Sequence, residues 1–391
     1  MGASDKTKAV HTGESFGKAW YINPMHPPIW LSNTFGADSP ERFAELCYWY
    51  GRVSNPNFTV LEKKYAALHD GKYALSFSTG MAAISSLFFS LLGNNTHVIA
   101  GQPLYCGTYD LLTRILPKMF KKFRVSFVKE TEQSPKFLRG LIRRSTALMY
   151  FSSPANPTMP IFDIKLWADI AAKARIPLAV DNTFATPINQ KPLDWGASVA
   201  VESLTKFSGD DGTRFGGIAV SDDRELTERL HYLRTHLGCT LDAEAAWHIA
   251  KSVRTLPTRI AAHNKNTAII AEYLLSCPKI KRVLYPGNPR SSGYPVAKTQ
   301  MSGFGSMLAF EINGGHRKLR RFAKRLVKAF GPLCVSLGSS NTIISPVYSS
   351  VYKDLPRSET KAMGITTGLF RVSVGLEDPH DLCKQFGDAL R

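Results

Sequence analysis

Short apolar runs alternate with longer helical patterns through the middle of this chain. From residue 61 onward, the β-like runs lie at 97–100, 147–151, 178–180 and 199–201, and each is followed by a loop and a longer stretch. Parallel strands need long crossover connections, so this alternation predicts a mostly parallel central sheet with crossover helices. The predicted fold class is α/β.

The pattern changes at about residue 256. A long helical pattern runs from about 259 to 275, and shorter strand-like pieces follow at 283–285, 307–312 and 370–374 with basic helices between them. We therefore predict a central α/β domain over residues 63–256 and a smaller α+β C-terminal domain over 257–391.

Residues 1–62 show no steady periodicity and are predicted to form an N-terminal arm. They are rich in prolines and aromatic residues, namely Pro24, Pro27, Pro28, Trp30, Tyr48, Trp49 and Tyr50. An extended arm cannot bury this much aromatic surface alone, so we expect it to contact a neighbouring subunit.

The 391 residues and their 44% hydrophobic content indicate a globular chain with a large core, which excludes a small binding module and a disordered chain. The longest apolar-rich stretch, 81–92, is shorter than the ~20 residues of a membrane span. No secretory signal is expected at the N-terminus. The six scattered cysteines contain no CxxC pair and are expected to be reduced, so the predicted location is cytoplasmic.

The charge is strongly basic, with 49 Lys and Arg against 31 Asp and Glu and a net charge of +18. Seven of the basic residues fall within 317–328, where Leu319, Phe322 and Leu326 keep helical spacing on the opposite face. This pattern predicts a solvated helix face, and no nucleic-acid motif accompanies it. We expect no nucleic-acid or membrane partner, although a non-catalytic nucleic-acid-binding protein stays open as an alternative of another class. No metal site is predicted.

Three motifs carry candidate chemistry. A Ser-Thr-Gly sequence at 78–80 precedes a strong helix-forming run, which indicates an anion site at a helix start. Asp181 ends one apolar strand, and Lys206, between Ser203 and Thr205, follows the next. An amine for a Schiff base, hydroxyls for a phosphate and a carboxylate for a pyridinium nitrogen together indicate an aldehyde cofactor.

Ten blocks of sequence resemble, in order, the Cys/Met metabolism family of pyridoxal-phosphate enzymes, which contains cystathionine γ-synthase, cystathionine γ-lyase and methionine γ-lyase. The blocks lie at 27–29 with 33–35, 50–56, 78–81, 105–108, 153–158, 181–185, 203–206, 300–305, 336–338 and 371–375. The resemblance implies the fold-type I (aspartate aminotransferase-like) architecture and pyridoxal 5'-phosphate as cofactor.

The resemblance also implies roles for single residues. Lys206 matches the lysine that forms the Schiff base and later moves protons. Asp181 matches the carboxylate that pairs with the pyridine nitrogen, and Tyr105 matches the tyrosine that stacks on the ring. The remaining cofactor-binding matches are Gly80, Met81, Ser203 and Thr205 at the phosphate, Asn156, and Tyr50 and Arg52, which reach a neighbouring subunit. The substrate-binding matches are Ser336, Asn341 and Arg371. The predicted assembly is a homo-oligomer, at least a dimer, with a tetramer expected.

Four positions depart from the family pattern. Asn341 stands where the family often has a Glu, and Ser152 where another Glu is common. Asp210 lies in a segment that replaces the usual Gly-His pair after the lysine, and Gly107 stands where methionine γ-lyases have a cysteine.

The function implied is γ-elimination or γ-replacement on an L-homoserine-type amino acid, an activated homoserine or a thioether amino acid, through a vinylglycine quinonoid. Because Asn341 lies in a region that helps the family choose between β and γ chemistry, β-elimination from cystathionine or cysteine stays open. The neutral Asn341 favours substrates with an uncharged or acidic distal end.

Overall fold

A seven-stranded sheet forms the centre of the computed structural model, which describes residues 2–14, 25–210, 212–353 and 355–391. The strand order is β1-β7-β6-β5-β4-β2-β3. The strands are β1 (Tyr73–Phe77), β2 (His97–Gln102), β3 (Arg124–Lys129), β4 (Thr146–Ser152), β5 (Leu178–Asp181), β6 (Val199–Glu202) and β7 (Gly217–Ser221).

The sheet is mostly parallel. β2, β3, β4, β5 and β6 pair in parallel, while β7 is antiparallel to both of its neighbours, β6 and β1. The four strands predicted from the sequence are β2, β4, β5 and β6, so the prediction of a parallel core is confirmed. The other three strands were not predicted.

Helices cover both faces of this sheet because neighbouring residues of a strand point to opposite sides. On β4, Tyr150 packs edge-on against Phe88 of α4 (Gly80–Leu91), with ring centroids 5.1 Å apart. The next residue, Phe151, packs against Trp167 of α8 (Ile164–Lys173) at 4.9 Å on the other face. The further helices around the sheet are α5 (Cys106–Asp110), the π-helix Leu111–Ile115, α6 (Leu116–Met119), α7 (Pro135–Leu141), α9 (Thr186–Asn189), α10 (Arg224–Leu237) and α11 (Ala243–Val253), with 3-10 turns at Glu130–Glu132 and Pro192–Trp195.

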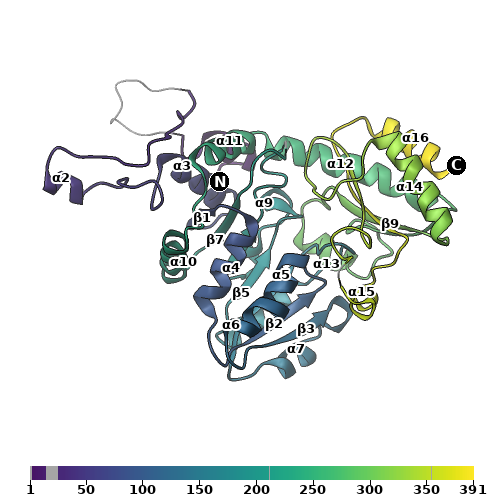
Figure 1. Cartoon of the computed structure of the whole chain (residues 1–391), viewed down its shortest axis with the longest axis horizontal. Coiled ribbons are helices and arrows are strands. Elements are labelled where there is room, and N and C mark those ends of the chain that lie inside the picture. The colour runs from purple at the N-terminus through teal and green to yellow at the C-terminus, as the bar shows by residue number, and fades with distance from the viewer. Residues whose placement is uncertain (1, 15–24, 211, 354) are drawn as a thin grey trace.

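A second, antiparallel sheet of order β10-β11-β9-β8 lies at the C-terminal end of the molecule (Figure 1). Its core is aromatic, with Phe310, Phe322, Phe370 and Phe386 in one buried cluster. The predicted pieces at 283–285, 307–312 and 370–374 correspond to three of its strands. The elements are α12 (Leu256–Ser276), β8 (Ile280–Leu284), α13 (Tyr294–Gln300), β9 (Met307–Ile312), α14 (His316–Phe330), β10 (Ile343–Pro346), α15 (Arg357–Ala362), β11 (Leu369–Ser373) and α16 (Pro379–Leu390).

The N-terminal part of the chain both packs on the body and projects from it. α1 (Asp5–His11) and α3 (Pro56–Leu68) lie against the body, where Ala9 and Leu61 are fully buried in one apolar cluster. The segment around α2 (Pro40–Ala44) projects to one side (Figure 1). Leu31 is 65% exposed and Trp49 44% exposed on this segment. The domain limits at residues 62 and 256 stay predictions.

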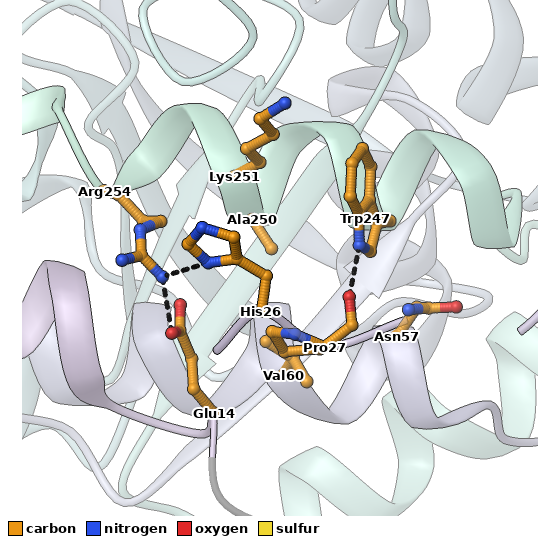
Figure 2. A pocket seen from close by; sticks show the side chains of 9 residues that line it. All are labelled: Glu14, His26, Pro27, Asn57, Val60, Trp247, Ala250, Lys251 and Arg254. Carbon is orange, nitrogen blue, oxygen red and sulfur yellow. Dashed lines mark hydrogen bonds and ion pairs between the residues drawn. The ribbon is translucent and has the colours of Figure 1, made fainter. Parts of the chain in front are cut away.

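Polar contacts fasten the base of the projecting segment to α11 and its C-terminal cap (Figure 2). Trp247 Nε1 donates to the Pro27 carbonyl at 2.6 Å. Arg254 pairs with Glu14 at 2.5 Å and donates to His26 Nδ1 at 3.0 Å. Glu14, His26 and Pro27 are therefore all held at this one helix and its cap.

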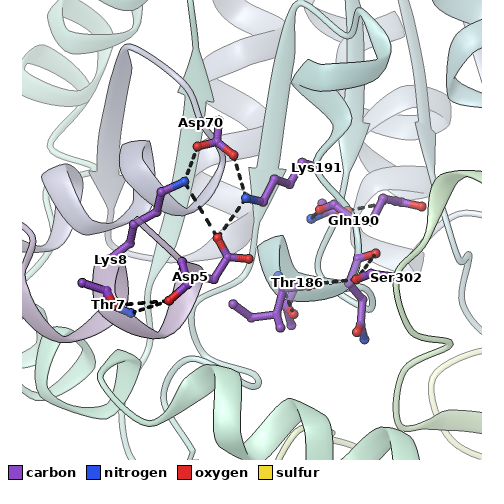
Figure 3. A network of polar contacts seen from close by, with 12 residues as sticks. Asp5, Thr7, Lys8, Asp70, Thr186, Gln190, Lys191 and Ser302 are labelled. Atoms are coloured by element: carbon purple, nitrogen blue, oxygen red, sulfur yellow. Dashed lines mark hydrogen bonds and ion pairs between the residues drawn. The ribbon is translucent and has the colours of Figure 1, made fainter. Parts of the chain in front are cut away.

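A charged network fastens α1 to the central domain (Figure 3). Lys191 pairs with Asp5 at 2.9 Å and with Asp70 at 2.6 Å, and Lys8 also pairs with Asp70. Each lysine of this network lies beside an aspartate, so the charges attract one another and hold α1 on the body. No helix within the described residues has the length and hydropathy needed to cross a membrane.

Candidate active site

Asp181 lies at the carboxyl end of β5, where open α/β sheets build their ligand sites. It is 8% exposed, and its Oδ1 accepts hydrogen bonds from the Thr183 amide at 3.0 Å and the Thr183 hydroxyl at 2.6 Å. Burial raises the pKa of the Asp181 carboxyl, although both bonds from Thr183 oppose the shift. A cation at Oδ2 would relieve the cost of holding this carboxylate ionised.

Lys206 follows β6, the neighbouring strand, in a turn at the same edge of the sheet. Its Nζ donates to the Ser336 hydroxyl at 3.2 Å. Burial lowers the pKa of Lys206, and the positive charge of Arg371 lowers it further. The amine is therefore more readily deprotonated than an exposed lysine.

Arg371 lies on β11 of the second sheet and is only 6% exposed. Its Nη1 donates to Asn156 Oδ1 at 2.7 Å, and its Nη2 donates to the Ser336 carbonyl at 3.0 Å. Its acceptors among the described residues are neutral, and no carboxylate there pairs with it. A buried guanidinium without a counter-ion is suited to binding a carboxylate that arrives from outside.

The segment 336–341 brings the second half of the chain against the lysine turn. Ser336 contacts both Lys206 and Arg371, and Ser340 donates to Asp210 at 2.9 Å. Asp210 also pairs with Arg259 at 3.5 Å. Asn341 is exposed at the end of this segment, and its amide contacts Ser339. Two of the departures from the family pattern, Asp210 and Asn341, are thus linked through this short loop.

The start of α4 lies against the same strand ends. Thr79 caps the helix by accepting a hydrogen bond from the Ala82 amide at 2.9 Å, while the amides of Gly80 and Met81 have no acceptor within the helix. A Cβ on Gly80 would lie 2.7 Å from the Ser203 Cβ, so only glycine lets the helix start approach this residue. Thr205 lies on the same loop, where its hydroxyl exchanges hydrogen bonds with the Gly216 backbone.

Tyr105 stands at the carboxyl end of β2 and is 42% exposed. Burial of the rest of its side chain raises the pKa of its phenol. A Cβ on Gly107 would lie 2.8 Å from Tyr105 Cε1 and 3.0 Å from Met81 Sδ. A larger residue at this departure from the family pattern would therefore displace the ring or the Met81 side chain.

Tyr50 and Arg52 make their contacts away from this cluster. Arg52 Nη1 donates to the Thr235 carbonyl on α10 at 2.7 Å, and its guanidinium lies 5.2 Å from the centroid of the Tyr50 ring. Ten of the sequence-predicted residues, all from the body, lie around the carboxyl ends of the strands or at the 336–341 segment and the adjoining Arg371. Tyr50 and Arg52 lie on the arm, and Asn341 lies at the outer end of its loop.

Tyr352 is a candidate site residue that sequence reasoning missed. It is 1% exposed, and its hydroxyl lies 3.1 Å from Asn156 Nδ2 and 3.2 Å from the Leu104 carbonyl. No periodicity or motif marks this position. Thr183 was also missed, although it lies two residues after Asp181 in the 181–185 block.

These groups fit pyridoxal phosphate. Within the described residues, Asp181 is a buried carboxylate that no cation contacts, and Lys206 is a partly buried amine with no acidic partner. The carboxylate suits a protonated ring nitrogen, the amine suits an aldehyde, and the start of α4 beside Ser203 suits a phosphate. Arg371 then remains available for a further carboxylate.

The chain is similar to known proteins over nearly its whole length. The chain is 35% identical over 385 residues to a cystathionine gamma-lyase of Bacillus subtilis, with 98% of each chain covered. It is 33% identical over 394 residues to a cystathionine beta-lyase of Staphylococcus haemolyticus, covering all of this chain and 95% of that protein.

A solved structure is also similar over the whole chain. The cystathionine gamma synthase from Xanthomonas oryzae, in complex with aminoacrylate and cysteine, superposes with a TM-score of 0.93 at 30% identity, covering 100% of this chain and 98% of that one. Residues 6–391 match the family described as Cys/Met metabolism PLP-dependent enzyme. The fold-type I prediction is confirmed, and the chain belongs to this family of pyridoxal-phosphate-dependent enzymes.

Proposed function

We propose that the protein catalyses γ-elimination or γ-replacement on an L-amino acid of the homoserine type, an activated homoserine or a thioether. The observation that carries the proposal is the placement of the buried Arg371 and of Lys206 on the two sides of Ser336. A substrate carboxylate at Arg371 places the neighbouring α-carbon on the side of the amine. This arrangement supports binding of an α-amino acid whose α-proton is removed.

The chain supplies the groups for proton transfer at that carbon. When bound, pyridoxal phosphate provides an electron sink for the electron pair left at the α-carbon. Lys206 Nζ removes the α-proton, and its lowered pKa increases the fraction of free base near neutral pH. Asp181 holds the proton of the ring nitrogen in place. Loss of a substituent at the γ-carbon also requires removal of a β-proton, which we assign to Lys206 Nζ as well. Tyr105 delivers a proton to the departing group.

The phosphate of the cofactor is assigned to the start of α4, with Gly80 and Met81 contributing amides and Ser203 and Thr205 hydroxyls. Helix starts bind phosphate through free amides and the helix dipole. Asn156 lies between the cofactor and substrate parts of the site because it contacts Arg371 directly. Ser336 adds a second polar contact for the substrate carboxylate.

Cystathionine separates γ- from β-elimination in one assay. Cleavage at the γ-carbon releases cysteine and, after hydrolysis, 2-oxobutanoate and ammonia, whereas β-cleavage releases homocysteine, pyruvate and ammonia. O-acetyl-, O-succinyl- and O-phosphohomoserine, each with and without cysteine, test γ-replacement, which yields cystathionine and no oxo acid. Formation of pyruvate alone across the panel would overturn the γ assignment.

β-Elimination is the second candidate function. Its support is the similarity to the relative named cystathionine beta-lyase, at 33% identity compared with 35% for the relative named cystathionine gamma-lyase. In both cases Arg371 and Lys206 would have the same roles.

We also propose a homo-oligomer in which the projecting segment covers a neighbouring subunit. Met25, Leu31, Phe43 and Trp49 are between 44% and 86% exposed in the single chain, which supports burial against another surface. In that assembly Tyr50 and Arg52 reach the cofactor phosphate of the neighbour. We assign the enzyme to the cytoplasm, on the reduced state expected for its six free cysteines.

For substrate choice, we propose a preference for an uncharged or acidic distal end. Asn341 is neutral and exposed at the end of the 336–341 segment, so it offers a distal ammonium group no carboxylate. O-Succinylhomoserine should therefore be used better than cystathionine. If cystathionine is the best substrate and Asn341→Glu worsens its use, this assignment is wrong.

A further inference from the structure

The basic face of α14 is not explained by the fold or by the proposed reaction. No acidic residue occurs between Glu311 and Asp354, a stretch that contains the seven Arg and Lys residues of α14. The apolar face of the helix accounts for its packing, because Phe322 and Leu326 are buried in the aromatic core of the second sheet. The basic face adds nothing to that packing.

These bases also have no acidic partner among the residues that the structure describes. Several exposed arginines on other helices pair with an acid one turn away, as Arg114 does with Asp110 and Arg224 with Glu228. Among the described ion pairs, none involves a base of α14. Instead, Arg317, Arg321 and Arg325 follow one another at intervals of four residues, and like charges at this spacing repel on a helix. Binding of an anion would relieve the repulsion.

A groove of about 560 Å³ lies along this helix, between α14, the end of β9 and the C-terminal end of α16. Six exposed bases line it: Arg317, Lys318, Arg321 and Arg325 of α14, together with Lys279 and Arg391. Its apolar side is formed by Leu319 and Phe322 among others. The volume is in the range of small-molecule sites, and the lining combines several cations with apolar surface.

We propose that this groove binds a small organic polyphosphate, such as a nucleoside triphosphate, with its phosphates on the arginines and its apolar part on the Leu319 side. Guanidinium groups bind phosphate oxygens in pairs, so clustered arginines favour adjacent phosphates over a single charge. A concave groove fits a compact ligand better than a membrane or a duplex, which would spread over the whole basic face. The inference is independent of the proposed reaction.

The helix itself provides a matched control. Arg320 and Lys324 are also exposed bases of α14 but do not line the groove. The double variants Arg317→Gln/Arg321→Gln and Arg320→Gln/Lys324→Gln therefore remove the same charge from the same helix. All four positions are exposed, so both variants should fold, and circular dichroism checks this.

The test is titration calorimetry of the pyridoxal-phosphate-loaded enzyme with ATP, inorganic triphosphate and AMP at ~0.1 M salt, where surface charges are already partly screened. ATP should bind more tightly than the other two. The groove variant should weaken ATP binding by about tenfold or more, and the control variant by less than about threefold.

Three results would overturn the proposal. The first is absence of ATP binding. The second is equal weakening by both double variants, which would indicate a diffuse polyanion surface such as one for nucleic acid. The third is equal affinity for inorganic triphosphate and ATP, which would exclude a contribution from the apolar side.

Discussion

Asn156 Oδ1 accepts a hydrogen bond of 2.7 Å from the buried Arg371 guanidinium, so a neutral amide stands where a buried arginine would ordinarily have a carboxylate. The amide orients the arginine without cancelling its charge. Arg371 thus keeps its full attraction for an incoming anion.

Replacing this amide by a carboxylate should impair substrate binding. Asn156→Asp changes no heavy-atom positions but gives Arg371 an internal counter-ion, so we expect KM to rise by about tenfold or more. Steady-state kinetics at saturating cofactor measure this. Asn264→Asp adds the same charge beside the amide of Asn189 and should leave KM unchanged. An unaltered KM in Asn156→Asp would contradict the role given to Arg371.

Tyr352 is expected to act as a positioning residue for Asn156. Tyr352→Phe keeps the buried ring but removes the hydroxyl 3.1 Å from Asn156 Nδ2, so the amide can rotate away from Arg371. KM should rise by about threefold to tenfold, since one neutral hydrogen bond is lost, with little change in kcat. Tyr109→Phe removes a different hydroxyl, which donates to Glu359 at 2.8 Å, and serves as the control. A fall in kcat at constant KM would indicate another role.

The pKa of Lys206 should be visible in the uptake of cofactor. The free amine reacts with the aldehyde, so the rate at which apoenzyme takes up pyridoxal phosphate should rise with pH and level off below 10.5, the ordinary pKa of lysine. Arg371→Gln removes a neighbouring positive charge, which raises the pKa of Lys206 and moves the midpoint to higher pH. Arg224→Gln on the exposed side of α10 should not move it. Identical midpoints for all three proteins would contradict the coupling between Lys206 and Arg371.

Stability should fall in mild acid because of one buried histidine. His97 is 1% exposed between three strands, where Thr146 and Ser126 contact its ring nitrogens, and burial lowers its pKa from 6.5 to about 4. The unfolded chain therefore binds the proton first as pH falls. The contribution of His97, about 3 kcal/mol, is complete above pH 6.5 and is lost between pH 6.5 and about 4.

Denaturant unfolding of the wild type and of His97→Asn at several pH values measures this loss. The variant should be less stable at pH 7 but should lose less stability on acidification. The exposed His380 on α16 provides the control, since His380→Asn should keep the wild-type slope. Equal slopes for wild type and His97→Asn would contradict the prediction.

The arm arginine should matter to a neighbouring subunit's site. Arg52→Ala should weaken cofactor retention by about 1.5–3 kcal/mol, the value of a charge-assisted bond. Arg42→Ala, also on the arm but paired with Asp38, should retain the cofactor. Mixing Arg52→Ala with Lys206→Ala under conditions of subunit exchange should restore activity, because mixed oligomers contain sites with both residues intact. No restoration after verified exchange would contradict a shared site.

The residues of the site at the strand ends could be predicted from the sequence. The hydrogen bonds that join them to distant parts of the chain could not. Asp181 and Lys206 could be identified because each follows a fully buried run at the carboxyl end of a strand. β3 was missed because its short apolar run is interrupted by Ser126 and bounded by Arg124 and Lys129. β7 was missed although its residues are as fully buried as those of the predicted strands. The bond between Asn156 and Tyr352 joins residues 196 positions apart, and no local pattern reports such a contact.

Ser336 contacts both Lys206 and Arg371 and so also sets the distance between these two side chains. Its hydroxyl faces Lys206 and its carbonyl faces Arg371, so the two cations are set apart by the span of a single residue. The distance between the α-carbon and the carboxylate is the same in every α-amino acid. The spacing between Lys206 and Arg371 therefore suits all α-amino acids equally. We therefore expect the groups that distinguish one amino acid from another to be recognised outside this span, by Tyr105, by the outer end of the 336–341 segment and, in the proposed oligomer, by the arm of a neighbouring subunit.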